Sequence, residues 1–456
     1  MTAGAGQSPS TTSVPRPDGL VLSPFRALRF DPAVAGDLRA NTCPPYDVID
    51  EDEAAALEAG SDVNVIRLIL PRSGVVAGQD RYAGAAATLV AWREQGVLVP
   101  DAKPALYVYE QAAPSGHVQR GLLGAVSLSP PQDGIVLPHE STMAGPVSDR
   151  LALYTAVEAD LEPIFLVYDG GGAASHAVAS VDDAGPDETA SGTRPGAAER
   201  PELLLDVDLP DGLRHRLWAL RDPDVLAGIA ADLHPRKALI ADGHHRYATY
   251  LRRQELHHEA GAGDGPWDTG LCFLVDATSF GPQVHPIHRV VPGLPADELA
   301  RRAEGGMAVR RLDGSVAAAL DALAEAGRVG PAFLLASADG EQLHLMSEPD
   351  RSRLAASVPP DRSAAWAGLD VSVLHGYIVP ALWGLPDDVE NVGYEHDVAS
   401  ALRAAGRTGG AAVLLNPTPV ESVATVAAAG ERMPRKSTLF TPKPRSGLVL
   451  RDHRDA

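Results

Sequence analysis

The chain has only two cysteines, Cys43 and Cys272, among its 456 residues. They lie far apart and form no Cys-x-x-Cys pair, which excludes a disulfide framework and a zinc ribbon built on cysteine. A reducing compartment is the simplest inference. Long apolar runs are also missing, because no uninterrupted apolar stretch approaches the roughly 18 residues that a membrane-spanning helix needs. These absences predict a cytoplasmic protein without a membrane span.

Positive charge is scarce as well. Lysine and arginine total 39 residues against 60 aspartates and glutamates, so the formal net charge is −21. Such a surface repels nucleic acid and anionic membranes, whereas a small anion in a local basic pocket remains compatible with it. The chain contains no P-loop pattern, dinucleotide fingerprint or internal repeat of fixed period. Nucleic-acid binding is therefore disfavoured, and no common nucleotide motif is present.

Apolar strand-like runs alternate with helical patterns along most of the chain, which predicts an α/β fold with two or three structural units. Residues 1–19 are rich in Ser, Thr, Gly and Pro and lack a basic start and an apolar segment, so they are expected to form a loose tail rather than a signal peptide. Residues 169–201 have a similar composition and are expected to form a flexible insertion. We therefore expect a core over 20–290 and a C-terminal α/β lobe over 291–456.

The most informative stretch is Ala241–Tyr247, which follows the apolar run 238–240 and leads into a helical pattern. It predicts a buried strand, a tight glycine turn and a helix. Backbone N–H groups at a helix start attract anions, and side-chain donors are added there by His244, His245 and Arg246. Asp242, at the strand end, could hold a divalent cation. These are the parts of a metal–phosphate site.

A purely structural interpretation of this stretch remains open. An aspartate before a helix is more often a cap than a metal ligand, so Asp242 could serve only to cap the helix. Three cationic or donor side chains crowded at one helix start are costly without an anion to satisfy them. The group as a whole therefore favours anion binding.

Two further segments place polar side chains on loops. In Pro44–Ile49, two prolines stiffen the backbone and present Tyr46 and Asp47. In Pro138–Met143, the adjacent His139 and Glu140 could converge on a site if the loop is irregular. The alternative for the second segment is an ordinary surface loop of mixed charge.

Three other sets of basic side chains are open to two interpretations. Arg67 lies in the apolar run 63–71, which is expected to be a strand, and needs either a protein carboxylate or an anionic ligand. Lys436, beside Arg435, is either a phosphate-binding residue or part of an exposed basic loop. A zinc site would need His285 and His288 to join His244 and His245, but a lone His-x-x-His is weak support for zinc.

Four segments in this order resemble the family known as domain of unknown function 1015, and the resemblance covers nearly the whole chain from about Leu20. They are Pro44–Ile49, Pro138–Glu140, Ala241–Tyr247 and Met433–Thr438. The Asp-Gly-His-His-Arg core is also similar to the phosphate-binding motif of the ParB-like superfamily, which includes CTP-binding ParB partition proteins and free serine kinases. The resemblance implies an α/β fold with a ParB-like, serine kinase-like mixed core and a C-terminal α/β lobe.

The same resemblance implies a phosphotransferase that converts free L-serine to O-phosphoserine, with a nucleotide or pyrophosphate donor and Mg²⁺. Asp242 would then work with the metal, and Glu140 or Asp47 would be the general base. Phosphate would be bound by His244, His245 and Arg246, with Lys436 as a further candidate. The substrate-binding candidates are Tyr46, Arg67 and His139. Phosphoryl transfer needs mainly positioning and charge neutralisation, which these residue types supply.

Two other function classes remain open. One is a ParB-like regulator that binds a nucleotide without turnover. The other is a metal-dependent hydrolase or nuclease, for which the four histidines would have to surround one ion. The expected partners are a small-molecule phosphate donor and an amino-acid acceptor, with no membrane. The oligomeric state is open.

Overall fold

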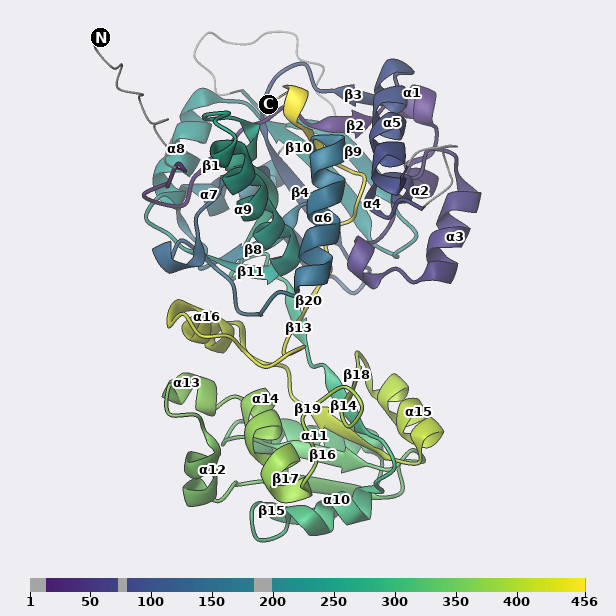
Figure 1. Ribbon diagram of the computed structural model, residues 1–456, viewed down its shortest axis with the longest axis vertical. Coiled ribbons are helices and arrows are strands. Elements are labelled where there is room, and N and C mark those ends of the chain that lie inside the picture. The colour runs from purple at the N-terminus through teal and green to yellow at the C-terminus, as the bar shows by residue number, and fades with distance from the viewer. Residues whose placement is uncertain (1–13, 73–79, 184–198, 456) are drawn as a thin grey trace, which may run out of the picture. The chain divides into compact units, whose positions relative to one another are not determined.

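The computed structural model describes residues 14–72, 80–183 and 199–455. The chain divides into two compact units (Figure 1). Unit 1 takes in the chain up to Val136, then Thr142–Pro282 and the segment from Pro442 onward, and unit 2 takes in Leu137–Ser141 and Gln283–Thr441. The lobe expected over 291–456 therefore differs from unit 2 at its end, because the last segment of the chain belongs to unit 1.

Among the described residues, unit 1 is built on a nine-stranded mixed sheet. Strand β12 (Thr269–Asp276) runs parallel to β8 (Ile164–Tyr168) and antiparallel to β5 (Val118–Ser127). All of β8 is buried, which explains its uninterrupted apolar sequence. The order is β6 (Val136–Leu137), β11 (Ala238–Asp242), β8, β12, β5, β4 (Leu106–Ala112), β10 (Arg214–Leu220) and β9 (Glu202–Asp208), with β1 (Leu22–Ser23) also on β5.

Two long helices, α6 (Ala144–Val157) and α9 (His244–Glu259), lie side by side across this sheet (Figure 1). They close a core of aliphatic and tyrosine side chains. The other helices are α1 (Pro32–Ala35), α2 (Leu38–Asn41), α3 (Glu51–Gly60), α4 (Ile66–Ile69), α5 (Arg81–Glu94), α7 (Gly172–Ala179) and α8 (Pro223–Leu233). Short strands pair β2 (Leu28–Phe30) with β3 (Leu98–Pro100) and β7 (Ala159–Asp160) with β21 (Arg451–Asp452).

Unit 2 holds a six-stranded antiparallel sheet in the part that the structure describes. Its order is β15 (Ala308–Leu312), β17 (Leu343–Ser347), β16 (Phe333–Ala336), β19 (Ala411–Leu415), β14 (His288–Val291) and β18 (Gly393–Glu395). A separate ribbon pairs β13 (Gln283–His285) with β20 (Leu439–Thr441). The helices are α10 (Ala296–Ala303), α11 (Val316–Gly327), α12 (Arg351–Ser357), α13 (Ala364–Ala367), α14 (Asp370–Val373), a π-helix (Leu374–Trp383), α15 (Val398–Thr408) and α16 (Val420–Ala428). The predicted α/β fold class is confirmed.

Two local predictions are wrong. The run 63–71 is not a strand, because Asn64 accepts a hydrogen bond from the Ile66 N–H at 2.8 Å and starts the short helix α4. Within the expected insertion, α7 is an ordered helix, since its small side chains pack closely and its Ser175 hydroxyl donates to Asp276 at 2.5 Å. Residues 184–198 of that insertion, and 1–13 of the expected tail, lie outside the described residues.

Every helix in the described ranges is too short or too polar to cross a bilayer. This finding agrees with the absence of long apolar runs in the sequence.

Asp370, at the start of α14, is expected to make the stability of the protein depend on pH. Burial raises the pKa of its carboxyl to about 7, although hydrogen bonds from the Ala332 backbone and the Asn416 side chain oppose the shift. Because the folded pKa lies above the unfolded one, stability is complete at low pH and is lost as the pH rises towards 7. We expect Asp370→Asn to raise the free energy of unfolding at pH 8 by about 1–3 kcal/mol. Urea denaturation at pH 8 and pH 4 checks this, and the same gain at both pH values would contradict it.

Candidate functional site

The predicted strand, glycine turn and helix are present at Ala241–Tyr247. Strand β11 ends at Asp242, Gly243 has a left-handed φ of 91°, and α9 begins at His244. A Cβ atom on Gly243 would lie 3.1 Å from the Arg246 Nε, so both the conformation and the close approach favour glycine. The pairing of β11 with β8 shifts register between Ile240 and Asp242, and such irregularities redirect the side chains beside them.

Asp242 does not cap α9, because Gly243 is the cap residue and no side chain accepts there. One Asp242 oxygen, Oδ2, accepts instead from the Arg246 guanidinium at 2.5 Å. Arg246 is 1% exposed, and its NH1 also donates to the Pro163 carbonyl at 2.5 Å. Burial opposes the charge on Arg246, but the carboxylates of Asp242, Glu162 and Asp47 outweigh it and raise the pKa of the guanidinium. The capping interpretation of Asp242 is therefore wrong.

The other Asp242 oxygen, Oδ1, lies 2.6 Å from the Lys443 ammonium, which lies equally close to Asp47 Oδ2. Lys443 thus joins two carboxylates from distant parts of the chain. Burial lowers the pKa of Lys443, but Asp242 and Asp47 outweigh this effect and raise it. The ammonium stays charged, and its side chain is 14% exposed against 35% for Asp47.

The backbone on which Lys443 sits is fixed by two buried glutamines. Gln111 donates to the Lys443 carbonyl at 2.9 Å, and Gln119 donates to the Pro442 carbonyl at 2.8 Å. Gln119 also donates to the Gln111 side chain at 2.8 Å. Because Gln111 lies on β4 and Gln119 on β5, these bonds tie the backbone at Lys443 to the large sheet.

Asp47 lies on a one-turn 3-10 helix, Tyr46–Val48, which the two preceding prolines introduce. Burial opposes ionisation of its carboxyl, but Lys443 and Arg246 outweigh burial and lower its pKa. The guanidinium carbons of Arg150 and Arg246 lie 4.4 and 5.9 Å from the centroid of the Tyr46 ring. The segment is thus held against the same arginine that binds Asp242.

Together, Asp47, Asp242, Arg246 and Lys443 form a cluster of two carboxylates and two cations, called the charge cluster below. The cluster adjoins the start of α9, where the backbone N–H groups of the first turn carry partial positive charge. His244 is buried there, and the Nε2 of His245 accepts from the Met143 N–H at 3.1 Å. Such an arrangement can bind an anion through its cations and accept a proton or a cation through its carboxylates.

The other predicted motifs meet in unit 2. Met433 donates its N–H to the His139 carbonyl at 2.8 Å, and His139 Nε2 lies 3.0 Å from the Thr438 hydroxyl. Lys436 is exposed and has a left-handed φ of 54°, and its carbonyl accepts from buried Arg289 at 3.0 Å. The four motif segments are therefore grouped in two pairs. Asp47 lies with Asp242 in unit 1, and the Pro138–Glu140 and Met433–Thr438 segments lie together in unit 2.

Arg67 lies on α4 and finds its partners locally. Its NH2 donates to the Glu58 carbonyl at 2.7 Å and lies 3.8 Å from the Asp62 carboxylate. These contacts supply hydrogen-bond and charge partners for the Arg67 guanidinium, which lies among apolar neighbours. A role for Arg67 in substrate binding stays a prediction.

The four histidines of the zinc alternative do not form a metal-ligand group within the described residues. His288 Nδ1 accepts from the Leu415 N–H at 3.2 Å, and burial with the neighbouring Arg289 lowers the pKa of His288 to about 4. The group with suitable spacing there is His258, Asp264 and Asp268. In that group, Asp268 accepts from His258, Gln254 and the Gly265 N–H. These hydrogen bonds give its carboxylate the role of stabilising the loop after α9.

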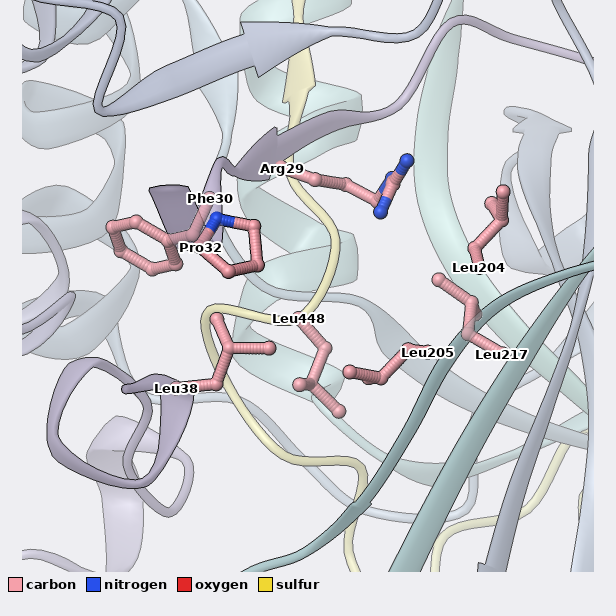
Figure 2. Close-up of a pocket in the computed structure, with 8 residues that line it drawn as sticks. All are labelled: Arg29, Phe30, Pro32, Leu38, Leu204, Leu205, Leu217 and Leu448. Atoms are coloured by element: carbon pink, nitrogen blue, oxygen red, sulfur yellow. The ribbon is translucent and has the colours of Figure 1, made fainter. Parts of the chain in front are cut away.

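An apolar hollow elsewhere in unit 1 shares no residue with the charge cluster (Figure 2). Leucine side chains point into it, and the Arg29 guanidinium at its edge is paired with Asp101 at 2.6 Å. Its lining is Arg29, Phe30, Pro32, Leu38, Leu204, Leu205, Leu217 and Leu448. The single charged group of the lining, Arg29, is already paired with Asp101, so the hollow is a poorer candidate for a phosphate site than the charge cluster.

The sequence analysis did not identify Lys443, a member of the charge cluster, or Glu162, a buried carboxylate whose charge acts on Arg246. Lys443 lies between two prolines in a short polar run with no pattern of its own. Glu162 does have a signal in the sequence, since it is a charged residue two positions before the fully buried strand β8. A buried carboxyl at such a position needs specific partners.

Comparisons with known proteins cover most of the chain. The model of the family described as protein of unknown function DUF1015 matches residues 22–372. The curated proteins contain no match. A mutant free serine kinase in complex with ADP is similar in structure, with 14% identity, a TM-score of 0.32 and coverage of 67% of this chain and 84% of that chain.

Two other solved structures are similar to the same degree. SbnI with a C-terminal truncation, from Staphylococcus aureus, has 9% identity and a TM-score of 0.33, with coverage of 72% of this chain and 86% of that chain. A conserved hypothetical protein from Pyrococcus furiosus has 14% identity and a TM-score of 0.32, with coverage of 70% and 94%.

Proposed function

The chain belongs to the DUF1015 family, and from this premise we propose that it is a Mg²⁺-dependent phosphotransferase that phosphorylates free L-serine to O-phosphoserine, with a nucleotide or pyrophosphate as donor. The observation that carries the proposal is the Lys443 ammonium, 2.6 Å from both Asp47 and Asp242. Phosphoryl transfer requires cations around the phosphate and a carboxylate near the attacking hydroxyl. The charge cluster supplies both kinds of group.

The contacts support the following roles for the residues of the charge cluster. Lys443 and the first turn of α9, with His244 and His245, bind the transferred phosphate. Arg246 is buried and doubly bonded, so it fixes Asp242 rather than reaching for the ligand. Asp47 is the more exposed carboxylate and accepts the serine hydroxyl proton as the hydroxyl oxygen bonds to phosphorus and the bond to the donor oxygen breaks. Glu140, the other predicted base, belongs to unit 2, and its role stays a prediction.

The carboxylates of the charge cluster also suit a magnesium ion. Mg²⁺ prefers carboxylate oxygens, and Asp242 offers such oxygens at the end of β11, beside the start of α9. Asp242 would hold the ion, and Asp47 would act as the base. A bound ion would neutralise charge on the phosphate.

The test is a direct assay of turnover. The full chain is incubated with Mg²⁺, L-serine and one of ATP, ADP, CTP or pyrophosphate, and O-phosphoserine is measured by mass spectrometry. We expect product with at least one donor and none after chelation with EDTA. Donor binding without product would overturn the proposal in favour of a nucleotide-binding regulator. Phosphate release that is independent of serine would overturn it in favour of a hydrolase.

A further inference from the structure

Glu162 lies between β7 and β8, is 1% exposed, and directs one carboxyl oxygen at two other chain segments. Its Oε1 accepts from the Tyr46 N–H at 3.0 Å and from the Ser446 hydroxyl at 2.7 Å. Its Oε2 has no hydrogen-bond partner among the described residues. A single oxygen therefore joins two segments that are remote in sequence.

Both segments carry the charge cluster. Tyr46 directly precedes Asp47, and Ser446 follows Lys443 on the same extended stretch. The two segments also pair with each other, because Cys43 and Ser446 exchange backbone hydrogen bonds of 3.2 and 3.0 Å. Glu162 Oε1 thus sets the distance between the chain at Asp47 and the chain at Lys443.

A third group depends on the same contact. The Tyr46 ring, whose backbone Glu162 holds, lies against the guanidinium groups of Arg150 and Arg246. Arg246 in turn binds Asp242. Movement of Tyr46 would therefore disturb both carboxylates of the charge cluster.

We infer that Glu162 is a positioning residue for the phosphotransferase site: its Oε1 fixes the segments that carry Asp47 and Lys443, and it does not touch the reacting groups. The inference rests on the proposed function only for its effect on turnover. Burial raises the pKa of the Glu162 carboxyl, although Arg246 and the Ser446 hydroxyl oppose the shift. The amide of glutamine keeps an oxygen that can accept both hydrogen bonds of Oε1, so Glu162→Gln preserves the contact that the inference invokes.

The experiment compares Glu162→Gln with Glu162→Leu in the full chain. Amide hydrogen exchange is measured over residues 43–48 and 443–447, together with kcat and KM for phosphotransfer. We expect Glu162→Gln to keep wild-type exchange and a kcat within about threefold of wild type. We expect Glu162→Leu to speed exchange in both segments at least tenfold and to lower kcat more than KM changes. Should Glu162→Leu fail to fold, Ser446→Ala removes one of the two bonds and should speed exchange to an intermediate degree.

Glu431→Leu is a matched control. Glu431 is also a buried glutamate that accepts from a backbone N–H and a serine hydroxyl, both of Ser363, but it lies in unit 2. It should leave exchange at 43–48 unchanged. Unchanged exchange in Glu162→Leu would overturn the inference, and so would equal losses of kcat in both Glu162 variants with wild-type exchange. If the wild-type chain forms no O-phosphoserine, the proposed function fails, while the exchange result still decides the positioning role.

Discussion

Replacing Lys443 by methionine is expected to lower the rate of phosphotransfer about 100- to 1,000-fold, the usual cost of removing one group that stabilises developing charge. The ammonium lies 2.6 Å from both Asp47 and Asp242, and methionine keeps most of its volume. Two carboxylates would then face each other without the cation between them, and the phosphate would lose its counter-charge. Steady-state kinetics with L-serine and the active donor measures the effect.

Lys103→Met is the control for this prediction, because Lys103 is an exposed lysine of the same unit without a salt bridge among the described residues. Its rate should equal that of wild type. A Lys443→Met protein with more than half the wild-type kcat would remove Lys443 from the mechanism. Asp242→Asn is a less selective test, since Asp242 is also the carboxylate partner of buried Arg246. Removing the Asp242 carboxylate would lower both the stability of the fold and the rate of phosphotransfer.

The second large effect is on stability. Asp160 is fully buried and accepts from Arg253 and Arg451 at 2.8 and 2.9 Å and from the Leu271 N–H at 3.0 Å. Asp160→Ala is expected to lower the free energy of unfolding by about 3–5 kcal/mol, because two buried guanidinium groups lose their carboxylate. The same residue pairs β7 with β21, so the end of the chain should also loosen. Urea denaturation at pH 7 measures the loss.

The control for Asp160 is an exposed ion pair of the same unit, between β9 and β10 of the large sheet. Asp206→Ala breaks the pair with Arg214, whose side chain is 54% exposed, and should cost no more than about 1 kcal/mol. Equal losses in the two variants would contradict the prediction. The pH dependence is a second check. Burial opposes ionisation of Asp160, but Arg253 and His453 outweigh it and lower its pKa. Its stabilisation is therefore present above pH 4 and is lost only in acid.

Local sequence predicted the elements well where short-range contacts decide them. The apolar run before Asp242, the glycine turn and the helix after it follow from spacing within a few residues, and all three are confirmed. The prediction of a strand over 63–71 is wrong for an equally local reason. The Asn64 side chain accepts from the backbone N–H of Ile66 and so favours a helix, which the apolar pattern of the run does not indicate. The prediction of a flexible insertion is wrong at α7, because its sequence of Gly, Ala and Ser has the composition of a loop although it forms a closely packed helix.

The amino-acid sequence by itself determined the fold class and the strand–turn–helix at Asp242, because these depend on patterning and on backbone conformations that neighbouring residues impose. The tertiary structure decided which motifs share a site. It brought Lys443 to Asp47, 396 positions away, and turned Asp242 from a possible helix cap into the partner of two cations. Such pairings depend on how the C-terminal segment packs against β4 and β5. No local pattern encodes that packing, so the central cation of the site could be found only in three dimensions.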